Sequence, residues 1–384
     1  MRVAIITENF LPKLDGVTRT LARLLEYLQT HEHQVLLLGP DSGMAEYAGA
    51  KIIGTAGVPL PFYPELKFNF FRPLFLRKLN EFRPDVIHLV DPVVLGTAGL
   101  AAARMLGKPL VSSYHTNLAA YCAHFGFPRL VRPMWSYNRF IHNQCALTFC
   151  PSPSTASILR AQGFQRVRIW PRGVDTALFR PGRRDEVKRA TWLQGEERVI
   201  LLYAGRISWE KNLRLLIQAY QGMDHTRCHL VIVGDGPAMS EVKQELAGLP
   251  VTFTGYLQGA ELASAYASAD LFAFPSQTET FGQVVLEATA SGLPVVALRA
   301  EGVRDIVEHE QTGYLLEVEG LSAQAQVARY QQLLTRLVEY PELRRTMGAT
   351  AQQAANQRTW DEAMARLLLG YAEVLEQEHP LVAA

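Results

Sequence analysis

The sequence has 384 residues, of which 48% are hydrophobic. Single hydrophobic cores stop growing near about 250 residues, so we expect two domains. The formal net charge is +1, with 38 basic and 37 acidic residues, which excludes a global field that recruits nucleic acid. The four cysteines lack Cys-x-x-Cys spacing, which disfavours a zinc site and a disulfide framework.

The N-terminal run from Met1 to Thr7 is short and apolar and stops at Glu8. It predicts a first strand rather than a signal peptide, so we expect a cytoplasmic protein. No window reaches the roughly 20 uninterrupted apolar residues of a spanning helix, so contact with a membrane would be peripheral, on its inner face.

Short β-branched runs alternate with helical patterns in the first half of the chain, which predicts a parallel sheet. Leucines at three- and four-residue spacing predict a first crossover helix over 18–28 and leave Gly16 in the loop before it. The expected strands cover residues 3–7, 34–38, 85–90, 109–113, 146–150 and 167–170.

The second half repeats this rhythm, which predicts a second doubly wound α/β domain. Proline, glycine and charged residues replace the apolar pattern over 171–185, where we place the hinge. We expect an N-terminal domain over 1–173, a C-terminal domain over 174–355, and a C-terminal helix within 356–384 that packs back on the first domain. The expected strands cover residues 198–203, 229–233, 251–254, 271–274 and 294–297.

The densest constellation of polar residues runs from Pro275 to Glu287, after a predicted strand and into a predicted helix. Ligands bind at this edge of open α/β sheets, and a helix N-terminus there suits a diphosphate. Glu279 and Glu287 bracket a span of ligand length. The alternative is that Glu279 is a solvated loop residue and Glu287 an exposed helix residue.

Two cations, Arg206 and Lys211, follow the strand at 198–203 within one loop. A guanidinium fork and an ammonium point charge suit a pair of phosphates, although they are also common on loop surfaces. The sequence lacks an Asp-x-Asp motif and a Gly-x-x-x-x-Gly-Lys loop, so we expect no metal or other cofactor. The charge of a leaving group would fall on the two cations and on helix N–H groups.

Two polar residues follow strands of the first domain. His115 comes just past the strand at 109–113, where its side chain would point into a cleft, although most lone histidines are structural. Asp91 has the same placement after the strand at 85–90, and there we favour a structural or cleft-shaping role.

Four segments of the second half, in this order, resemble the donor half of family-four retaining glycosyltransferases of GT-B fold. They are Gly205-Arg206 with Lys211, 234–237, Gly255-Tyr256 and 279–287. The resemblance extends over nearly the whole chain, because it includes segments 113–116, 132–135 and 170–175. These three segments resemble the sulfoquinovosyl-diacylglycerol synthases. Actinobacterial lipid mannosyl- and glucuronosyl-transferases are similar through the Arg-Gly-Val-Asp and donor segments. The resemblance implies two Rossmann-like domains facing across a cleft and sugar transfer without an established covalent enzyme nucleophile.

Residue by residue, the resemblance implies that Arg206 and Lys211 bind the donor diphosphate. Glu287 would bind the ribose hydroxyls and Glu279 would touch the transferred sugar. The family often has a Gly-Gly pair in the first loop, where this sequence has Asp15 before Gly16. The further implied contacts are Phe281 and Gly282 to the sugar or diphosphate, Gly16 to the phosphate, Gly255, Tyr256 and Leu257 to the base, and His115 to the sugar near the reacting centre.

Basic and aromatic residues interleave over 61–83 and again over 127–135, a composition that suits a membrane interface. Filling of the first domain's core is the alternative for both stretches. We expect a UDP-linked donor and a lipid acceptor such as diacylglycerol. The alternatives are a soluble acceptor, GDP-mannose as donor, or a nucleotide-sugar-binding protein without turnover. The residues expected at the acceptor or membrane are Lys67, Phe71, Arg72, Arg132 and Trp135.

Overall fold

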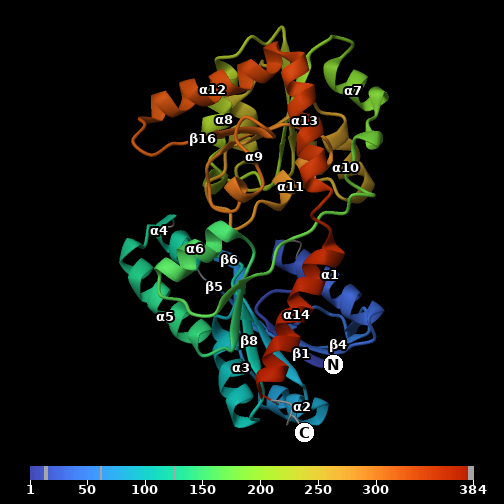
Figure 1. The fold of residues 1–384 in the computed structure, drawn as a ribbon. Helices are drawn as coiled ribbons and strands as arrows, with labels where there is room; N and C mark the ends of the chain where they lie inside the picture. The colour runs from blue at the N-terminus through green and yellow to red at the C-terminus, as the bar shows by residue number, and fades with distance from the viewer. Residues whose placement is uncertain (13–15, 61–62, 125, 379–384) are drawn as a thin grey trace. The chain divides into compact units, whose positions relative to one another are not determined.

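The computed structural model describes residues 1–12, 16–60, 63–124 and 126–378. The chain forms two compact units, each with its own parallel sheet (Figure 1). Unit 1 comprises Met1–Arg172 and the chain from Trp360, and unit 2 comprises Gly173–Thr359. The two expected boundaries, after residues 173 and 355, compare with observed boundaries after 172 and 359.

The sheet of unit 1 has the strand order β10-β9-β8-β7-β1-β2-β4-β3, and only β3 runs antiparallel to its neighbour. Its order reverses between β1 and β7, as in a doubly wound fold. The strands are β1 Arg2–Thr7, β2 Gln34–Pro40, β3 Glu46–Tyr47, β4 Ala50–Thr55, β7 Val86–Val90, β8 Leu110–Ser113, β9 Leu147–Cys150 and β10 Val167–Ile169. A separate antiparallel hairpin joins β5 Gly57–Leu60 and β6 Tyr63–Asn69.

Alternate residues of β1 face opposite layers of helices because successive side chains of a strand point to opposite faces. Val3 and Ile5 pack with leucines of α1, and Ala4 and Ile6 pack with residues of α2 and α3. The helices of unit 1 are α1 Gly16–Thr30, α2 Pro73–Phe82, α3 Val94–Met105, α4 Leu118–His124, α5 Val131–Asn143, α6 Pro153–Ala161 and α14 Trp360–Glu378, with a 3₁₀ turn η1 at Pro128–Leu130.

Helix α14, red in Figure 1, belongs to unit 1 although it follows unit 2 in the chain. Its buried residues Met364, Leu367, Tyr371 and Val374 recur at three- and four-residue spacing and pack on the same face of the sheet as α1. The prediction that a C-terminal helix returns to the first domain is confirmed.

The sheet of unit 2 has the order β13-β12-β11-β14-β15-β16, so β11 pairs with β14 although two strands separate them in the chain. The chain order reverses at this pair. The strands are β11 Val199–Ala204, β12 Cys228–Val233, β13 Val251–Gly255, β14 Leu271–Phe274, β15 Val295–Leu298 and β16 Gly313–Leu316. The helices are α7 Glu186–Leu193, α8 Leu213–Gln221, α9 Met239–Glu245, α10 Gly259–Ala267, α11 Gln283–Ala290, α12 Ala323–Glu339 and α13 Pro341–Ala355, with 3₁₀ turns η2 Pro181–Arg183, η3 Trp209–Lys211 and η4 Val303–Asp305.

The sequence did not predict β3, β4 and the hairpin in unit 1, or β16 in unit 2. Strand β16 comprises the four buried residues Gly313–Leu316. The basic and aromatic stretch at 61–83 divides into β6 and α2, because Pro73 starts a helix at a position that a proline favours.

Candidate active site

Two loops of unit 2 meet at the reversal of strand order, the loop from β11 to α8 and the loop from β14 to α11. Lys211 Nζ lies 2.7 Å from Glu279 Oε1, which joins the loops by an ion pair. Thr278 donates a hydrogen bond to the carbonyl of Glu210 (3.2 Å), and Asn212 donates one to the carbonyl of Pro275 (3.2 Å). Lys211 and Glu279, which we predicted as site residues, therefore contact each other at the ligand-binding edge of the sheet.

The carboxylate of Glu279 is held from two sides. Ser276 Oγ donates to the same oxygen, Oε1, at 2.9 Å, and the ammonium of Lys211 lies beside it. The side chains of Lys211 and Glu279 are 18% and 17% exposed, so both are shielded and both remain accessible to a ligand. The alternative that Glu279 is a solvated loop residue is wrong.

Helix α11 begins beside this ion pair. Gly282 precedes its first turn with φ +89°, a left-handed conformation that glycine adopts without strain. Gly302, from the loop after β15, presses against Phe281, since a Cβ on Gly302 would lie 2.4 Å from Phe281 Cα. The backbone that opens α11 is therefore fixed from outside the helix, and its first amides are available to an anion.

Glu287 lies one turn further along α11 and is only 3% exposed. The hydroxyl of Tyr266 donates to Glu287 Oε2 at 3.3 Å. A buried carboxylate needs hydrogen-bond partners, and a ligand hydroxyl is one that suits it. The alternative that Glu287 is an exposed helix residue is wrong.

Arg206 and the Gly234–Pro237 turn complete this side of the sheet. Tyr203 donates its hydroxyl hydrogen to the carbonyl of Arg206 (3.0 Å), which fixes the start of the loop. A Cβ on Gly234 would lie 1.9 Å from the carbonyl oxygen of Gly205, so only glycine permits the two loops to approach this closely. The Gly-Asp-Gly-Pro turn, a weak signal by itself, thus supports the loop that carries the two cations.

The predicted base-contacting residues lie at the end of β13, the edge strand of the sheet, and directly after it. Gly255 has φ +73° and accepts the N–H of Gly234 (2.9 Å), which connects this loop to its neighbour. Tyr256 is 53% exposed and Leu257 packs against the core of unit 2. Tyr256 is therefore the residue of this segment with a free aromatic face.

In unit 1, the loops after β7 and β8 are joined by Asp91. Its Oδ1 accepts the backbone N–H of His115 (3.2 Å) and of Thr116 (3.1 Å), and its Oδ2 accepts the Thr116 hydroxyl. Asp91 itself has φ +50°. These contacts hold the loop that carries His115 in one conformation.

The His115 ring is buried and contacts a cation that sequence reasoning named only as part of a motif. Arg172 Nη2 lies 2.9 Å from His115 Nδ1. Burial lowers the pKa of His115 well below its usual value, and the charge of Arg172 lowers it further. His115 is therefore a neutral imidazole at physiological pH.

Glu8 is a buried carboxylate that sequence reasoning missed. Its Oε1 accepts the backbone N–H groups of Val93 (3.0 Å) and Gly96 (3.1 Å) at the start of α3, and Asn69 donates to its carbonyl (3.0 Å). Burial raises the pKa of Glu8 to about 7. The available signal was its position directly after β1, at the sheet edge that also carries Asp91 and His115.

Gly16 is the first residue of α1, and the residues before it at 13–15 lie outside the described part of the chain. Among the residues expected at the acceptor or membrane, Phe71 packs edge to face on the buried Phe75, with ring centres 5.3 Å apart. Trp135 stacks on Tyr114 and packs with the buried Phe164. The two aromatic rings therefore contribute to packing in unit 1.

Two predicted cations of the acceptor region are more exposed than these aromatic residues. Arg72, directly before α2, and Arg132, in the first turn of α5, are both exposed. The side chain of Lys67 lies outside the described part of the structure.

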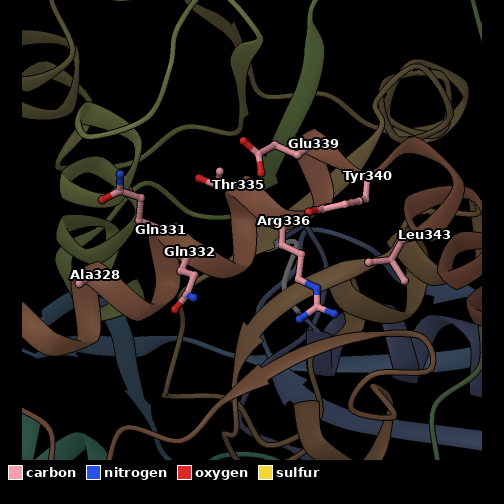
Figure 2. Close-up of a pocket in the computed structure, with 8 residues that line it drawn as sticks. All are labelled: Ala328, Gln331, Gln332, Thr335, Arg336, Glu339, Tyr340 and Leu343. Carbon is pink, nitrogen blue, oxygen red and sulfur yellow. The ribbon is translucent and has the colours of Figure 1, made fainter.

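A cavity of about 760 Å³ opens on helices α12 and α13 (Figure 2). None of the predicted site residues lines it. Its lining residues are Ala328, Gln331, Gln332, Thr335, Arg336, Glu339, Tyr340 and Leu343. Within the described residues, no three His, Cys, Asp or Glu side chains form a cluster that would hold a metal ion.

The chain belongs to the family-four glycosyltransferases. Residues 14–178 match the family described as Glycosyltransferase Family 4, and residues 184–354 match Glycosyl transferases group 1. The GDP-mannose-dependent alpha-mannosyltransferase of Mycolicibacterium smegmatis is 38% identical over 381 residues, which is 98% of each chain. The sulfoquinovosyl transferase SQD2 of Arabidopsis thaliana is 38% identical over 306 residues, 78% of this chain and 60% of that protein.

Solved structures show the same fold. Sucrose-phosphate synthase from Thermosynechococcus elongatus matches with a TM-score of 0.79 over 98% of this chain and 99% of its own, at 19% identity. Anabaena Alr3699/HepE in complex with UDP matches with a TM-score of 0.77 over 97% of this chain and 100% of its own, at 20% identity. Two Rossmann-like domains of GT-B type, as predicted, are thereby confirmed.

The raised pKa of Glu8 gives a test of its environment. Because its pKa rises from 4.5 to about 7 on folding, the protonated form favours the native state, and its contribution is lost as the pH rises from 4.5 through 7. Relative to Glu8→Gln, the wild type should lose about 2–3 kcal/mol of unfolding free energy over this window. Gln Oε1 can still accept both amides.

Urea unfolding of both proteins at pH 4.5, 6.0 and 7.5 measures this difference, and the comparison removes the contributions of all other groups. A difference between the two proteins that stays constant with pH would contradict the buried carboxyl at Glu8.

Proposed function

We propose that this glycosyltransferase moves a sugar from a nucleoside-diphosphate donor to a lipid acceptor with retention of anomeric configuration. The observation that carries the proposal is the ion pair of Lys211 with Glu279 beside the start of α11, at the switch point of the unit 2 sheet. It unites a cation for a diphosphate, a carboxylate for a sugar and free helix amides in one place.

In the proposed mechanism, Arg206, Lys211 and the amides of α11 stabilise the negative charge that develops on the departing diphosphate. A diphosphate near Lys211 competes with Glu279 for the ammonium, which releases the carboxylate to bind a sugar hydroxyl. Glu287 binds the ribose hydroxyls. The acceptor hydroxyl attacks on the face that the phosphate leaves, and a phosphate oxygen takes its proton, so catalysis is by orientation and charge stabilisation.

For the donor we place GDP-mannose first. The full-length relative from Mycolicibacterium smegmatis carries this donor in its name, as does one from Corynebacterium glutamicum that is 34% identical over 99% of this chain. A UDP-linked sugar, our expectation from the sequence, is the second candidate. SQD2, also 38% identical, is named for the transfer of a sulfoquinovosyl group rather than mannose.

For the acceptor we propose a lipid such as diacylglycerol. The alpha-monoglucosyldiacylglycerol synthase of Streptococcus pneumoniae is 29% identical over 82% of this chain and 75% of its own. None of the described helices is long and apolar enough to span a membrane. Access to the lipid would then be by docking of unit 1 on the bilayer surface.

The cations of the two basic and aromatic stretches, at 61–83 and 127–135, differ in whether they form ion pairs. In α2, Arg77 and Lys78 both contact Glu81, so one carboxylate offsets one of their two positive charges. No acidic residue occurs between Asp91 and Asp175, a segment with nine basic residues. In it, the exposed Phe127 (47%), Leu130 (48%) and Phe140 (58%) accompany the exposed Arg129, Arg132 and Arg139 on η1 and α5.

We therefore assign the bilayer contact to η1 and α5 rather than to α2. Among the described residues, Arg129, Arg132 and Arg139 form no ion pair. Unneutralised cations attract anionic headgroups, and apolar side chains beside them insert between the lipids.

The donor assignment predicts that Lys211→Ala lowers kcat by about 100- to 1,000-fold, because it removes a preorganised positive charge at the leaving group. EDTA should leave the turnover of the wild type unchanged. Turnover would be followed by mass spectrometry with GDP-mannose, UDP-glucose, UDP-glucuronate, UDP-galactose and UDP-sulfoquinovose, with diacylglycerol supplied.

The matched control is Lys188→Ala, which breaks an ion pair of similar length (2.8 Å, to Glu261) elsewhere in unit 2. Its kcat should equal that of the wild type. Equal losses in both variants, or a strict need for an added divalent metal, would refute the proposed role of Lys211.

The docking assignment predicts that Arg129→Gln, Arg132→Gln and Arg139→Gln together weaken binding to anionic liposomes. Each cation contributes on the order of 1 kcal/mol near such a surface, so the triple variant should bind about 100-fold less tightly. The control changes Arg77 and Lys78 to glutamine, the two cations of α2 that share the carboxylate of Glu81, and should weaken binding less than the triple variant does.

Co-sedimentation with anionic and with neutral liposomes measures both. Equal binding by the triple variant and the wild type would show that η1 and α5 do not face the bilayer. Preference for a water-soluble acceptor would favour the soluble-acceptor alternative.

A further inference from the structure

Arg172 is the last residue of unit 1 and is buried, with only 6% of its surface exposed. Its Nη2 lies 2.9 Å from His115 Nδ1. Its guanidinium carbon lies 5.8 Å from the centre of the Trp170 ring, and that ring meets His115 edge to face with centres 5.4 Å apart. The three side chains form one buried cluster.

The chemistry of the guanidinium determines which nitrogen of His115 carries the proton. Arginine has five N–H donors and no acceptor, so His115 Nδ1 accepts the hydrogen bond through its lone pair. A neutral imidazole with a free lone pair on Nδ1 carries its proton on Nε2. Burial and the neighbouring charge of Arg172 both lower the pKa of His115, which keeps the ring neutral.

The rest of the cluster keeps the ring in place. Asp91 holds the backbone N–H of His115, while Trp170 packs against its ring. Main chain and side chain are therefore fixed by different neighbours.

We propose that Arg172 is a positioning residue that fixes His115 as the Nε2–H tautomer, which makes His115 a hydrogen-bond donor to the sugar at the reacting centre. This inference rests on the proposed function, in which His115 contacts the transferred sugar. With the other tautomer, Nε2 is an acceptor and cannot donate a hydrogen bond to an oxygen of the sugar.

The main chain after Arg172 is also anchored. The carbonyl of Gly173 accepts a hydrogen bond from Gln283 Nε2 (3.0 Å), at the first residue of α11. The N–H of Val174 donates to the carbonyl of Arg358 (2.8 Å). These bonds lie within unit 2, so the covalent link between Arg172 and Gly173 joins the residue that orients His115 to the residue that is bonded to the donor-site helix.

The test replaces Arg172 by Lys, Gln and Met in the full-length protein labelled with ¹⁵N-histidine. Long-range ¹H–¹⁵N NMR spectra assign the tautomer of His115 without any substrate. In the wild type we expect an unprotonated Nδ1 and a protonated Nε2 from pH 5.5 to 8. In Arg172→Met both tautomers should appear. Lys, which donates and cannot accept, should retain the Nε2–H form, whereas Gln, whose amide oxygen can accept from Nδ1–H, should allow both tautomers.

Activity provides the second measurement. Arg172→Met should lower kcat by about 10- to 100-fold, less than the loss of a whole preorganised donor, and should change the donor KM by less than about 3-fold. Arg172→Lys should recover most of the activity. In a His115→Ala background, Arg172→Met should cost less than about 3-fold more, because the two residues act as one unit.

Arg168→Met, which removes a guanidinium that pairs with Glu373 at the surface, is the control and should leave both spectrum and kcat unchanged. If Arg172→Met does not fold, the Lys and Gln variants still report the tautomer. Protonated Nδ1 in the wild type, or unchanged His115 resonances in Arg172→Met, would overturn the inference. A different result would overturn the role of His115 in the proposed function. That result is a kcat of His115→Ala equal to that of the wild type while the NMR changes are as expected.

Discussion

The pairing of β11 with β14 is the constraint on which the proposed donor site of unit 2 depends. These strands are neighbours in space and are separated by two strands in the chain, so their following helices leave on opposite sides and a crevice opens between the two loops. Lys211 comes from one loop and Glu279 from the other, and they meet only because of this pairing. A register change at β14 would separate the ion pair and move the start of α11.

Close approach of the backbones gives this crevice its shape. Gly234 allows the loop after β12 to lie against the carbonyl of Gly205, and Gly302 allows the loop after β15 to lie against Phe281. Each added Cβ would overlap a backbone atom, and backbone atoms cannot move aside as the end of a side chain can. The glycines thus act on the site indirectly, by placing the loops that carry Arg206, Lys211 and Glu279.

The sequence predicted the elements that short-range patterns determine. Strands such as β1, β7 and β11 appear as apolar runs, and Lys211 and Glu279 appear as polar residues directly after strands. The sequence could not show that Glu8 contacts the start of α3, because the bonded residues Val93 and Gly96 are 85 and 88 positions away. Arg172 contacts His115 across 57 positions, and its adjacent motif suggested only family membership. Lys78 and Glu81 are three residues apart, a spacing that brings side chains together only in a helix. Their ion pair could therefore not be predicted before α2 was known.

We propose that unit 2 binds the diphosphate of the donor between the loops after β11 and β14. A crystal structure of the protein with GDP, and a second with UDP, tests it most directly. We expect phosphate oxygens within hydrogen-bonding distance of Arg206, Lys211 and the amides of Phe281 and Gly282, with the ribose hydroxyls at Glu287. A nucleotide bound elsewhere in unit 2, for example in the cavity on α12 and α13, with the Lys211–Glu279 ion pair intact and no phosphate beside it, would contradict the account.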